Sequence, residues 1–141
     1  MANFSYEKMS FELERSITQA ELTAGYNHLH HADTLRLLEE GRVWFLEEIG
    51  FPLQGLLEQG LFLVITQISV QYRRELFAEP VRISCFEPRV EGTRLSLRQE
   101  IVKAPKRRAI VAEIEFCCMD SESKRAIAPP KELLEAFLKG L

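Results

Sequence analysis

The feature that most constrains how this chain folds is the order of its segments: one long helix-forming stretch precedes four strand-forming stretches. Residues 31–49 contain no proline and lead into Gly50 and Pro52, which are typical of a helix C-terminus. Apolar and alternating side chains then recur in four runs separated by short polar turns, which predict one antiparallel sheet. The four runs are residues 61–72, 81–88, 93–103 and 109–119.

Three further segments complete the predicted fold. Residues 9–18 alternate apolar and polar side chains and predict a fifth strand ahead of the helix, whereas residues 51–60 indicate a short connector with at most one helical turn. Pro129 and Pro130 precede a short amphipathic helix. We therefore expect one α+β domain over residues 1–141, an antiparallel five-stranded sheet wrapped around one long helix. One helix cannot cover such a sheet, so self-association is expected.

The composition excludes several classes of protein. With 46% hydrophobic and 28% charged residues, the chain is typical of a globular protein and not of a disordered one. A net charge of −3 provides no broad positive surface for nucleic acid, and the longest apolar run, residues 61–65, is far shorter than the ~20 residues of a membrane span. Two of the three cysteines, Cys117 and Cys118, are neighbours, which argues against a disulfide framework. These observations predict a cytoplasmic protein without nucleic-acid or membrane partners.

Two charged residues point toward the predicted core side of the long helix. At about 100° per residue from Leu35, the apolar stripe includes Leu38 and Phe45, and Glu39 and Arg42 fall within it. Burying a carboxylate costs several kcal/mol unless it is paired or hydrogen-bonded. Glu39 is therefore either ion-paired with Arg42 or retained for chemistry, and the sequence leaves both alternatives open.

Two large hydrophobic residues lie on the opposite side of the predicted helix. Leu37 and Trp44 lie there on the helical wheel, which indicates either a subunit contact or ordinary surface scatter. Glu40 falls on the solvated side and is expected to be inert.

A loop rich in histidine precedes the helix. The backbone N–H groups of a helix N-terminus stabilise a carbonyl oxygen or a developing oxyanion, which favours acyl chemistry at this end. His28, His30 and His31 lie in this loop, and each alone could equally be a cap or a surface residue. No second cluster of ligands stands at metal-binding spacing, so we expect no metal.

The histidine-rich loop and the long helix that follows it resemble the corresponding segments of the 4-hydroxybenzoyl-CoA thioesterase family of the hotdog fold. The family pattern is roughly Gly-His-Val-Asn-Asn-Ala, followed by a helix that bears Glu and Ala-Arg. Downstream, the strand leading to Tyr72 and the turn containing Asp120 also fit, so the likeness covers nearly the whole chain. The resemblance implies hydrolysis of an acyl-CoA thioester without a cofactor or metal, in a homodimer or homotetramer whose active sites lie at the subunit interface. The residues that carry the likeness at the helix are residues 26–32, Leu35, Leu38, Glu39, Arg42, Phe45 and Leu46.

The resemblance also implies roles for particular residues. Glu39 is the expected base that activates water, with His28 or His31 as alternatives. Backbone N–H groups near His31 and Ala32 would polarise the thioester carbonyl, and Asn27 or His28 would orient the acyl group.

Other residues are assigned to substrate binding. Arg42 would set the pKa of Glu39, and Tyr26 belongs to the matched loop. Arg73 and Arg74 are candidates for the nucleotide end of coenzyme A, because mobile cations at loop edges suit phosphates. A second basic cluster, residues 106–108, is either a further phosphate site or a solvated turn.

One departure from the family pattern leaves the activity open. Many members carry an Asp just before the Gly-His turn as nucleophile or base, and this chain has Ala24 there. An alternative function is therefore a non-catalytic acyl-CoA or acyl-thioester binding protein that has lost this Asp. Dehydration of hydroxyacyl chains is disfavoured, because the expected His-then-Pro-Gly arrangement is missing.

Overall fold

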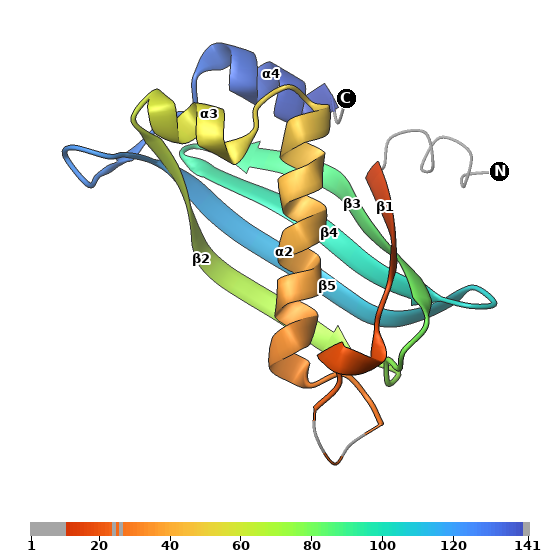
Figure 1. Cartoon of the computed structure of the whole chain (residues 1–141). Coiled ribbons are helices and arrows are strands. Elements are labelled where there is room, and N and C mark those ends of the chain that lie inside the picture. Colours follow the sequence, from red (N-terminus) through yellow and green to blue (C-terminus); the bar gives the residue numbers. More distant parts are fainter. Residues whose placement is uncertain (1–10, 24, 26, 140–141) are drawn as a thin grey trace, which may run out of the picture.

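One long helix lies across one face of a twisted antiparallel sheet (Figure 1). The computed structural model describes residues 11–139 except 24 and 26. Its elements in chain order are β1 (Phe11–Ser16), the 3-10 helix η1 (Gln19–Glu21), α2 (His31–Glu48), α3 (Leu53–Glu58), β2 (Leu61–Tyr72), β3 (Pro80–Glu91), β4 (Arg94–Lys103), β5 (Arg107–Asp120), β6 (Ala126–Ile127) and α4 (Lys131–Lys139).

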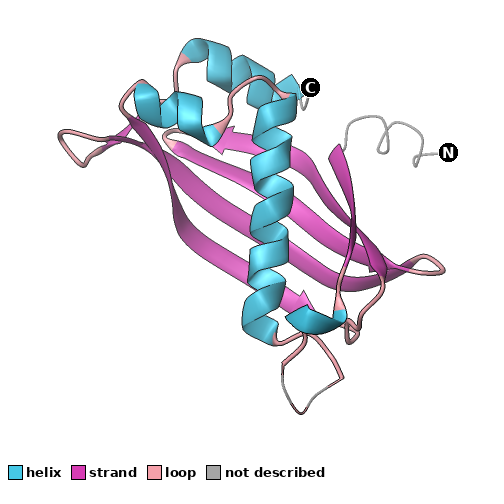
Figure 2. Ribbon diagram, viewed as in Figure 1, coloured by secondary structure: helices cyan, strands magenta, loops and turns pink. Residues whose placement is uncertain are grey.

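The sheet has the order β1-β3-β4-β5-β2, and all of its pairings are antiparallel. The two-residue strand β6 pairs with the end of β5. The helices α3 and α4 lie beside the C-terminal end of α2 (Figure 2). The predicted α+β architecture is confirmed: a hotdog-like sheet of five long strands packs around one helix, and β6 is a small addition.

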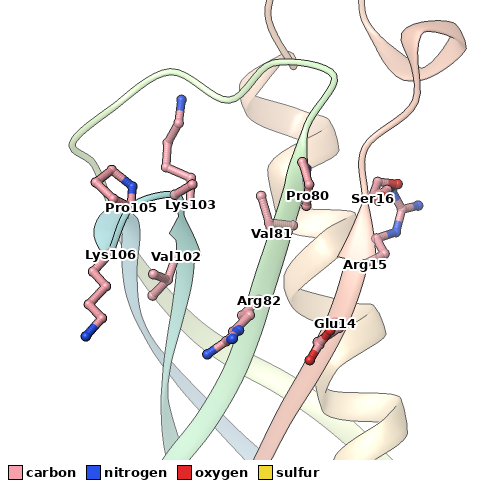
Figure 3. A pocket seen from close by; sticks show the side chains of 11 residues that line it. Glu14, Arg15, Ser16, Pro80, Val81, Arg82, Val102, Lys103, Pro105 and Lys106 are labelled. Atoms are coloured by element: carbon pink, nitrogen blue, oxygen red, sulfur yellow. The ribbon is translucent and has the colours of Figure 1, made fainter.

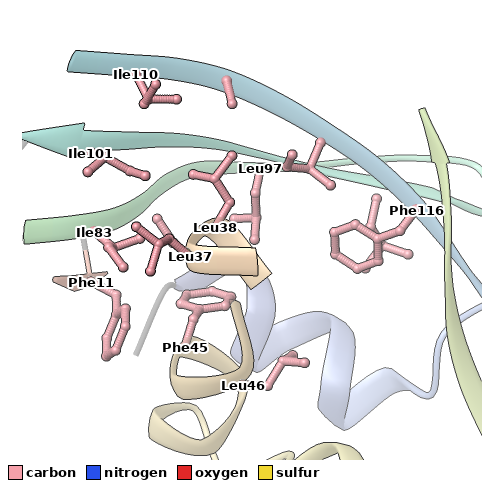
Figure 4. Packing of buried hydrophobic residues seen from close by; sticks show 14 of the residues in the cluster. Phe11, Leu37, Leu38, Phe45, Leu46, Ile83, Leu97, Ile101, Ile110 and Phe116 are labelled. Atoms are coloured by element: carbon pink, nitrogen blue, oxygen red, sulfur yellow. The ribbon is translucent and has the colours of Figure 1, made fainter. Parts of the chain in front are cut away.

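The core forms where α2 meets the inward rows of the strands. Leu38 and Phe45 of α2 pack among buried strand residues such as Ile83, Leu97 and Ile101 (Figure 4). At the C-terminal end of α2, the ring of Phe45 meets the ring of Phe137 from α4 edge-on, with 6.0 Å between their centroids. The C-terminal end of the long helix is thereby fixed to α4 by side-chain packing.

The buried arc of α2 differs from the arc predicted from the helical wheel. Leu37, expected on the outer side, is only 2% exposed, whereas Leu35, the expected centre of the stripe, is 36% exposed. The reason is that α2 packs toward β1, β3 and β4, which turns the buried arc toward Leu37 and away from β2. Trp44 is 47% exposed, as the wheel predicted, and its role in a subunit contact stays a prediction.

The edge strand β2 presents an apolar row toward the inside of the sheet. Ile65 lies opposite Phe116 and Ile68 lies opposite Ile114, with a register irregularity between Ile65 and Gln67. Because directly paired residues share a face, Ile65 and Ile68 face inward although they are three positions apart. They are nevertheless 41% and 38% exposed, because α2 leaves this part of the sheet uncovered.

Close approach of α2 to the sheet depends on Gly41. A Cβ atom at this position would lie 2.6 Å from Cγ2 of Ile83 and 3.2 Å from Nε2 of Gln99. Ile83 is fully buried on β3, so it has little room to move. A residue without a side chain is therefore required where α2 crosses the strands.

We expect Gly41→Ala to lower the free energy of unfolding by up to about 2 kcal/mol, because overpacking a tight core costs about 1–3 kcal/mol and the helix-propensity gain is about 1 kcal/mol. Urea unfolding measures the change. Gly55→Ala in α3 is the matched control, since its Cβ would meet only Pro52 Cγ at an ordinary 3.7 Å. A Gly41→Ala protein as stable as the control variant would show that the contact with Ile83 relaxes freely.

Candidate active site

The N-terminus of α2 is capped by His30. Its Nδ1 accepts a hydrogen bond from the Ala32 N–H at 3.1 Å, and its carbonyl accepts from the N–H groups of Asp33 and Thr34. Of the two N–H groups expected to polarise a carbonyl, that of Ala32 is thus already bonded within the chain. The N–H of His31 has no protein acceptor among the described residues, so it is the donor that can meet a ligand.

A pocket of about 320 Å³ opens at this end of the helix. The structure brings four predicted site residues together in its lining: His28, His31, Arg73 and Arg74. The loop residue Asn27 and the first-turn residue Ala32 are exposed near it but do not line it. Two positions of the sequence analysis, Ala24 and Tyr26, lie outside the described residues.

Two residues of this pocket were not assigned a role from the sequence. Tyr72, at the end of β2, donates a hydrogen bond from its hydroxyl to the carbonyl of His31 at 3.1 Å. Glu75 places Oε2 at 3.6 Å from Nδ1 of His28. A carboxylate beside an imidazole can orient the ring, so His28 and Glu75 together resemble a base and its orienting acid.

The basic residues at the end of β2 continue into a second hollow. It measures about 520 Å³, shares Arg73, Arg74 and Glu75 with the first pocket, and is also lined by Arg107 and Phe77. Arg107 of the second predicted basic cluster therefore lines the same hollow as Arg73 and Arg74. A separate hollow of about 530 Å³ lies between β1, β3 and the turn at residues 104–106, and Lys106 of the second basic cluster is the only residue predicted from the sequence in its lining (Figure 3).

Glu39 and Arg42 lie elsewhere, in a narrow cleft between α2 and β2. The cleft measures about 90 Å³ and is otherwise lined by apolar side chains. Glu39 follows His31 by eight residues, which is about 12 Å along a helix at 1.5 Å per residue. Within one chain, the predicted base is therefore separated from the free N–H of His31 by more than two helical turns.

The structure does not contain the ion pair considered for Glu39 and Arg42. Within the described part of the chain, no carboxylate lies within 4.0 Å of the Arg42 guanidinium, and Glu39 is exposed at the cleft. Arg42 instead donates from Nη1 to Oε1 of Gln99 at 2.9 Å. Burial lowers the pKa of Arg42, and the charge of Glu39 partly opposes this effect.

Gln99 is the residue of this site that the sequence reading missed. It is fully buried on β4, and its Nε2 donates to the carbonyl of Leu38 at 3.0 Å and to Sγ of Cys85 at 3.2 Å. Burial raises the pKa of the Cys85 thiol to about 12, so this thiol stays protonated. Strand periodicity could have identified it, because the alternation of side chains along β4 places Gln99 in the same inward row as Leu97 and Ile101.

An ion-pair cluster holds the chain that leads into the loop before α2. Arg15 donates from Nη1 to Oε1 of Glu21 and from Nε to Oε1 of Glu40, both at 2.8 Å. The hydrogen bond from Arg15 lowers the pKa of Glu21 to about 2. Glu21 is therefore committed to structure and cannot replace the missing Asp at position 24 as a base. Glu40, expected to be inert in solvent, is a structural partner of Arg15.

Comparison with protein families decides where this chain belongs. Residues 21–137 match the model of the thioesterase-like superfamily. The chain belongs to this superfamily. Its placement in the 4-hydroxybenzoyl-CoA branch stays a prediction. No curated protein matches the sequence.

Solved structures agree with a thioesterase-like fold. A 1,4-dihydroxy-2-naphthoyl-CoA thioesterase from Synechocystis superposes with a TM-score of 0.82 at 17% identity, covering 91% of this chain and 95% of that one. The probable thioesterase YbaW of Escherichia coli gives 0.77 at 25% identity, with 91% and 96% covered. A Staphylococcus aureus protein in complex with CoA gives 0.84 at 17% identity, with 93% and 85% covered.

The described residues of this thioesterase-like chain provide neither a membrane-spanning helix nor a metal-binding cluster. The described helices include none that is long and apolar enough to cross a membrane. In residues 11–139 without 24 and 26, no group of three or more potential ligands could hold a metal ion.

We expect Glu21→Gln to remove about 1 kcal/mol of stability at pH 7, a value discounted for the exposure of this side chain. Because the folded pKa of about 2 lies below the ordinary 4.5, the contribution is present above about pH 4.5 and is lost as the pH falls toward 2. Urea unfolding of both proteins between pH 7 and pH 2 measures it. The control is Glu14→Gln, exposed on the same strand as Arg15; a constant difference across this range would contradict the assignment.

Proposed function

We propose that the protein hydrolyses an acyl-CoA thioester to a free acid and coenzyme A. The observation that carries this proposal is the free N–H of His31 at the N-terminus of α2, in a pocket that continues into a cationic hollow. Such an N–H group stabilises the oxyanion that forms when water attacks a thioester carbonyl. Membership of the thioesterase-like superfamily supports the same reaction.

The cationic hollow suits the nucleotide end of coenzyme A. Arg74 and Arg107 make no ion pair within 4.0 Å among the described residues, and Arg73 is hydrogen-bonded to the neutral Gln71. Their charges are therefore available to phosphate groups. A solved structure with this fold is a complex with CoA, which supports a ligand of this class. The predicted roles of Tyr26, Asn27 and Ala32 in orienting the acyl group belong to the same proposal.

Self-association completes the proposed site. The open edge of β2, twelve residues long, carries the exposed apolar row of Ile65 and Ile68. Pairing of two such edges around a twofold axis buries this row and brings the α2 helix of each subunit beside the other. Glu39 of one subunit can then serve the α2 N-terminus of the other, which removes the ~12 Å separation along one helix. A homodimer is the smallest such assembly, and a homotetramer repeats it.

Glu39 is the proposed general base, and His28, oriented by Glu75, is the alternative. Glu39 is a carboxylate without an ion-pair partner within 4.0 Å in the described chain, and it lines an apolar cleft. A base in this position deprotonates the attacking water, while the N–H of His31 holds the carbonyl oxygen. The imidazole of His28 lies in the same pocket as that N–H.

We expect Glu39→Gln to lower kcat about 10²–10⁴-fold with little change in stability, because it removes only the proton acceptor. Release of free thiol from a panel of alkyl-CoA and aryl-CoA esters measures this. The matched control is Glu47→Gln, exposed on the same helix, which should turn over normally. Unchanged turnover in Glu39→Gln together with loss in His28→Gln would transfer the role of base to His28.

A second candidate function is acyl-CoA binding without turnover. It is favoured by Ala24 in place of the family Asp and by the commitment of Glu21 to Arg15. The same panel discriminates between the two functions. Binding of CoA esters by calorimetry without thiol release from any ester supports a binding protein.

We expect Ile68→Asp to convert the assembly to monomers, because a carboxylate in the row buried between two β2 strands would be desolvated without a partner. Light scattering coupled to size-exclusion chromatography gives the mass, and the thiol assay should show parallel loss of activity. Ser69→Asp changes the outward row of the same strand and should leave the mass unchanged. A wild-type protein that is already monomeric at micromolar concentration would contradict this assembly.

A further inference from the structure

The Arg42 guanidinium has no ion-pair partner within 4.0 Å among the described residues. Its only hydrogen bond to a side chain in the described residues goes to the neutral amide oxygen of Gln99. A guanidinium carries five N–H donors, so most of them remain for a ligand in the cleft that Arg42 lines. A partly buried cation without a compensating anion is unfavourable, and an anionic ligand would relieve this cost.

Gln99 fixes the position of this charge before any ligand binds. Its amide is fully buried and is held at Nε2 by the helix carbonyl of Leu38 and by Cys85. Only its Oε1 is left to accept from Arg42. A donor fixed in this way loses little conformational entropy when a ligand arrives. Gln99 is accordingly a positioning residue, because it acts on a ligand through Arg42.

The cleft around Arg42 is small and otherwise apolar. Its volume is about 90 Å³. Its remaining walls are apolar side chains from α2, α3, β2, β4 and β5. The exposed Glu39 lies at the same cleft. A short apolar chain whose end is charged matches these dimensions and this chemistry.

We propose that the cleft between α2 and β2 binds the acyl part of the substrate, and that Arg42, held by Gln99, selects acyl groups that end in a carboxylate. The planar guanidinium matches a carboxylate with two parallel hydrogen bonds, which a methyl end cannot make. The inference rests on the proposed function, since it names the class of acyl group for that reaction.

The test compares glutaryl-CoA with pentanoyl-CoA, which have equal chain length and differ in the terminal group. Thiol release gives kcat/KM, and calorimetry with the corresponding non-hydrolysable thioethers gives binding. We expect the wild type to prefer the carboxylate-ended ligand at least tenfold in both measurements. Arg42→Met should abolish the preference by weakening the binding of the carboxylate-ended ligand alone. Gln99→Met should reduce the preference mainly through a higher KM for that ligand. Arg36→Met, exposed on the same helix, is the control that keeps it.

The outcomes separate the inference from the proposed function. Preferential binding of the carboxylate-ended thioether without thiol release would refute hydrolysis and keep the inference. The inference would be overturned if the wild type bound and turned over both ligands equally well. It would also be overturned if Arg42→Met weakened the binding of both ligands equally, or if neither ligand bound. Should Arg42→Met fail to fold in a circular-dichroism melt, Arg42→Lys keeps the charge without the planar fork, and an undiminished preference in that variant would also overturn the bidentate contact.

Discussion

The close contact between α2 and the inward rows of β3 and β4 is the constraint on which the rest of this structure depends. Gly41 allows the helix to approach Ile83, and the buried amide of Gln99 ties the helix carbonyl of Leu38 to the sheet. The same amide orients Arg42. One crossing point therefore provides core packing, satisfies a buried polar group and fixes a charge beside an open cleft.

This contact also explains why α2 covers one half of the sheet and leaves the other half open. Because α2 is drawn toward β1, β3 and β4, the inner surface of β2 is left uncovered. The uncovered half contains the cleft with Glu39, whereas the helix N-terminus carries the pocket with His28 and His31. The proposed chemistry needs both places, and an assembly of two chains is the simplest arrangement that joins them.

The sequence predicted the fold well because its signals are local. Pro52 and the glycines mark the end of the helix, and apolar or alternating runs separated by polar turns marked every long strand. The buried arc of the helix was predicted less well: Leu37 is buried and Leu35 is not, because the arc depends on which strands the helix covers. Gln99 contacts Leu38 and Arg42, which lie 61 and 57 positions away along the chain, so no local pattern disclosed its partners.

Because of the register irregularity in β2, the exact number of residues in this strand decides which side chains face inward. One extra residue near Thr66 keeps Ile65 and Ile68 on the same side, so deleting a single residue there would turn the second half of the strand over. Gln67, Ser69 and Gln71 would then point inward, and Tyr72 would leave the carbonyl of His31. Relatives that keep this surface should therefore tolerate exchanges of side chain along β2 far better than changes in its length.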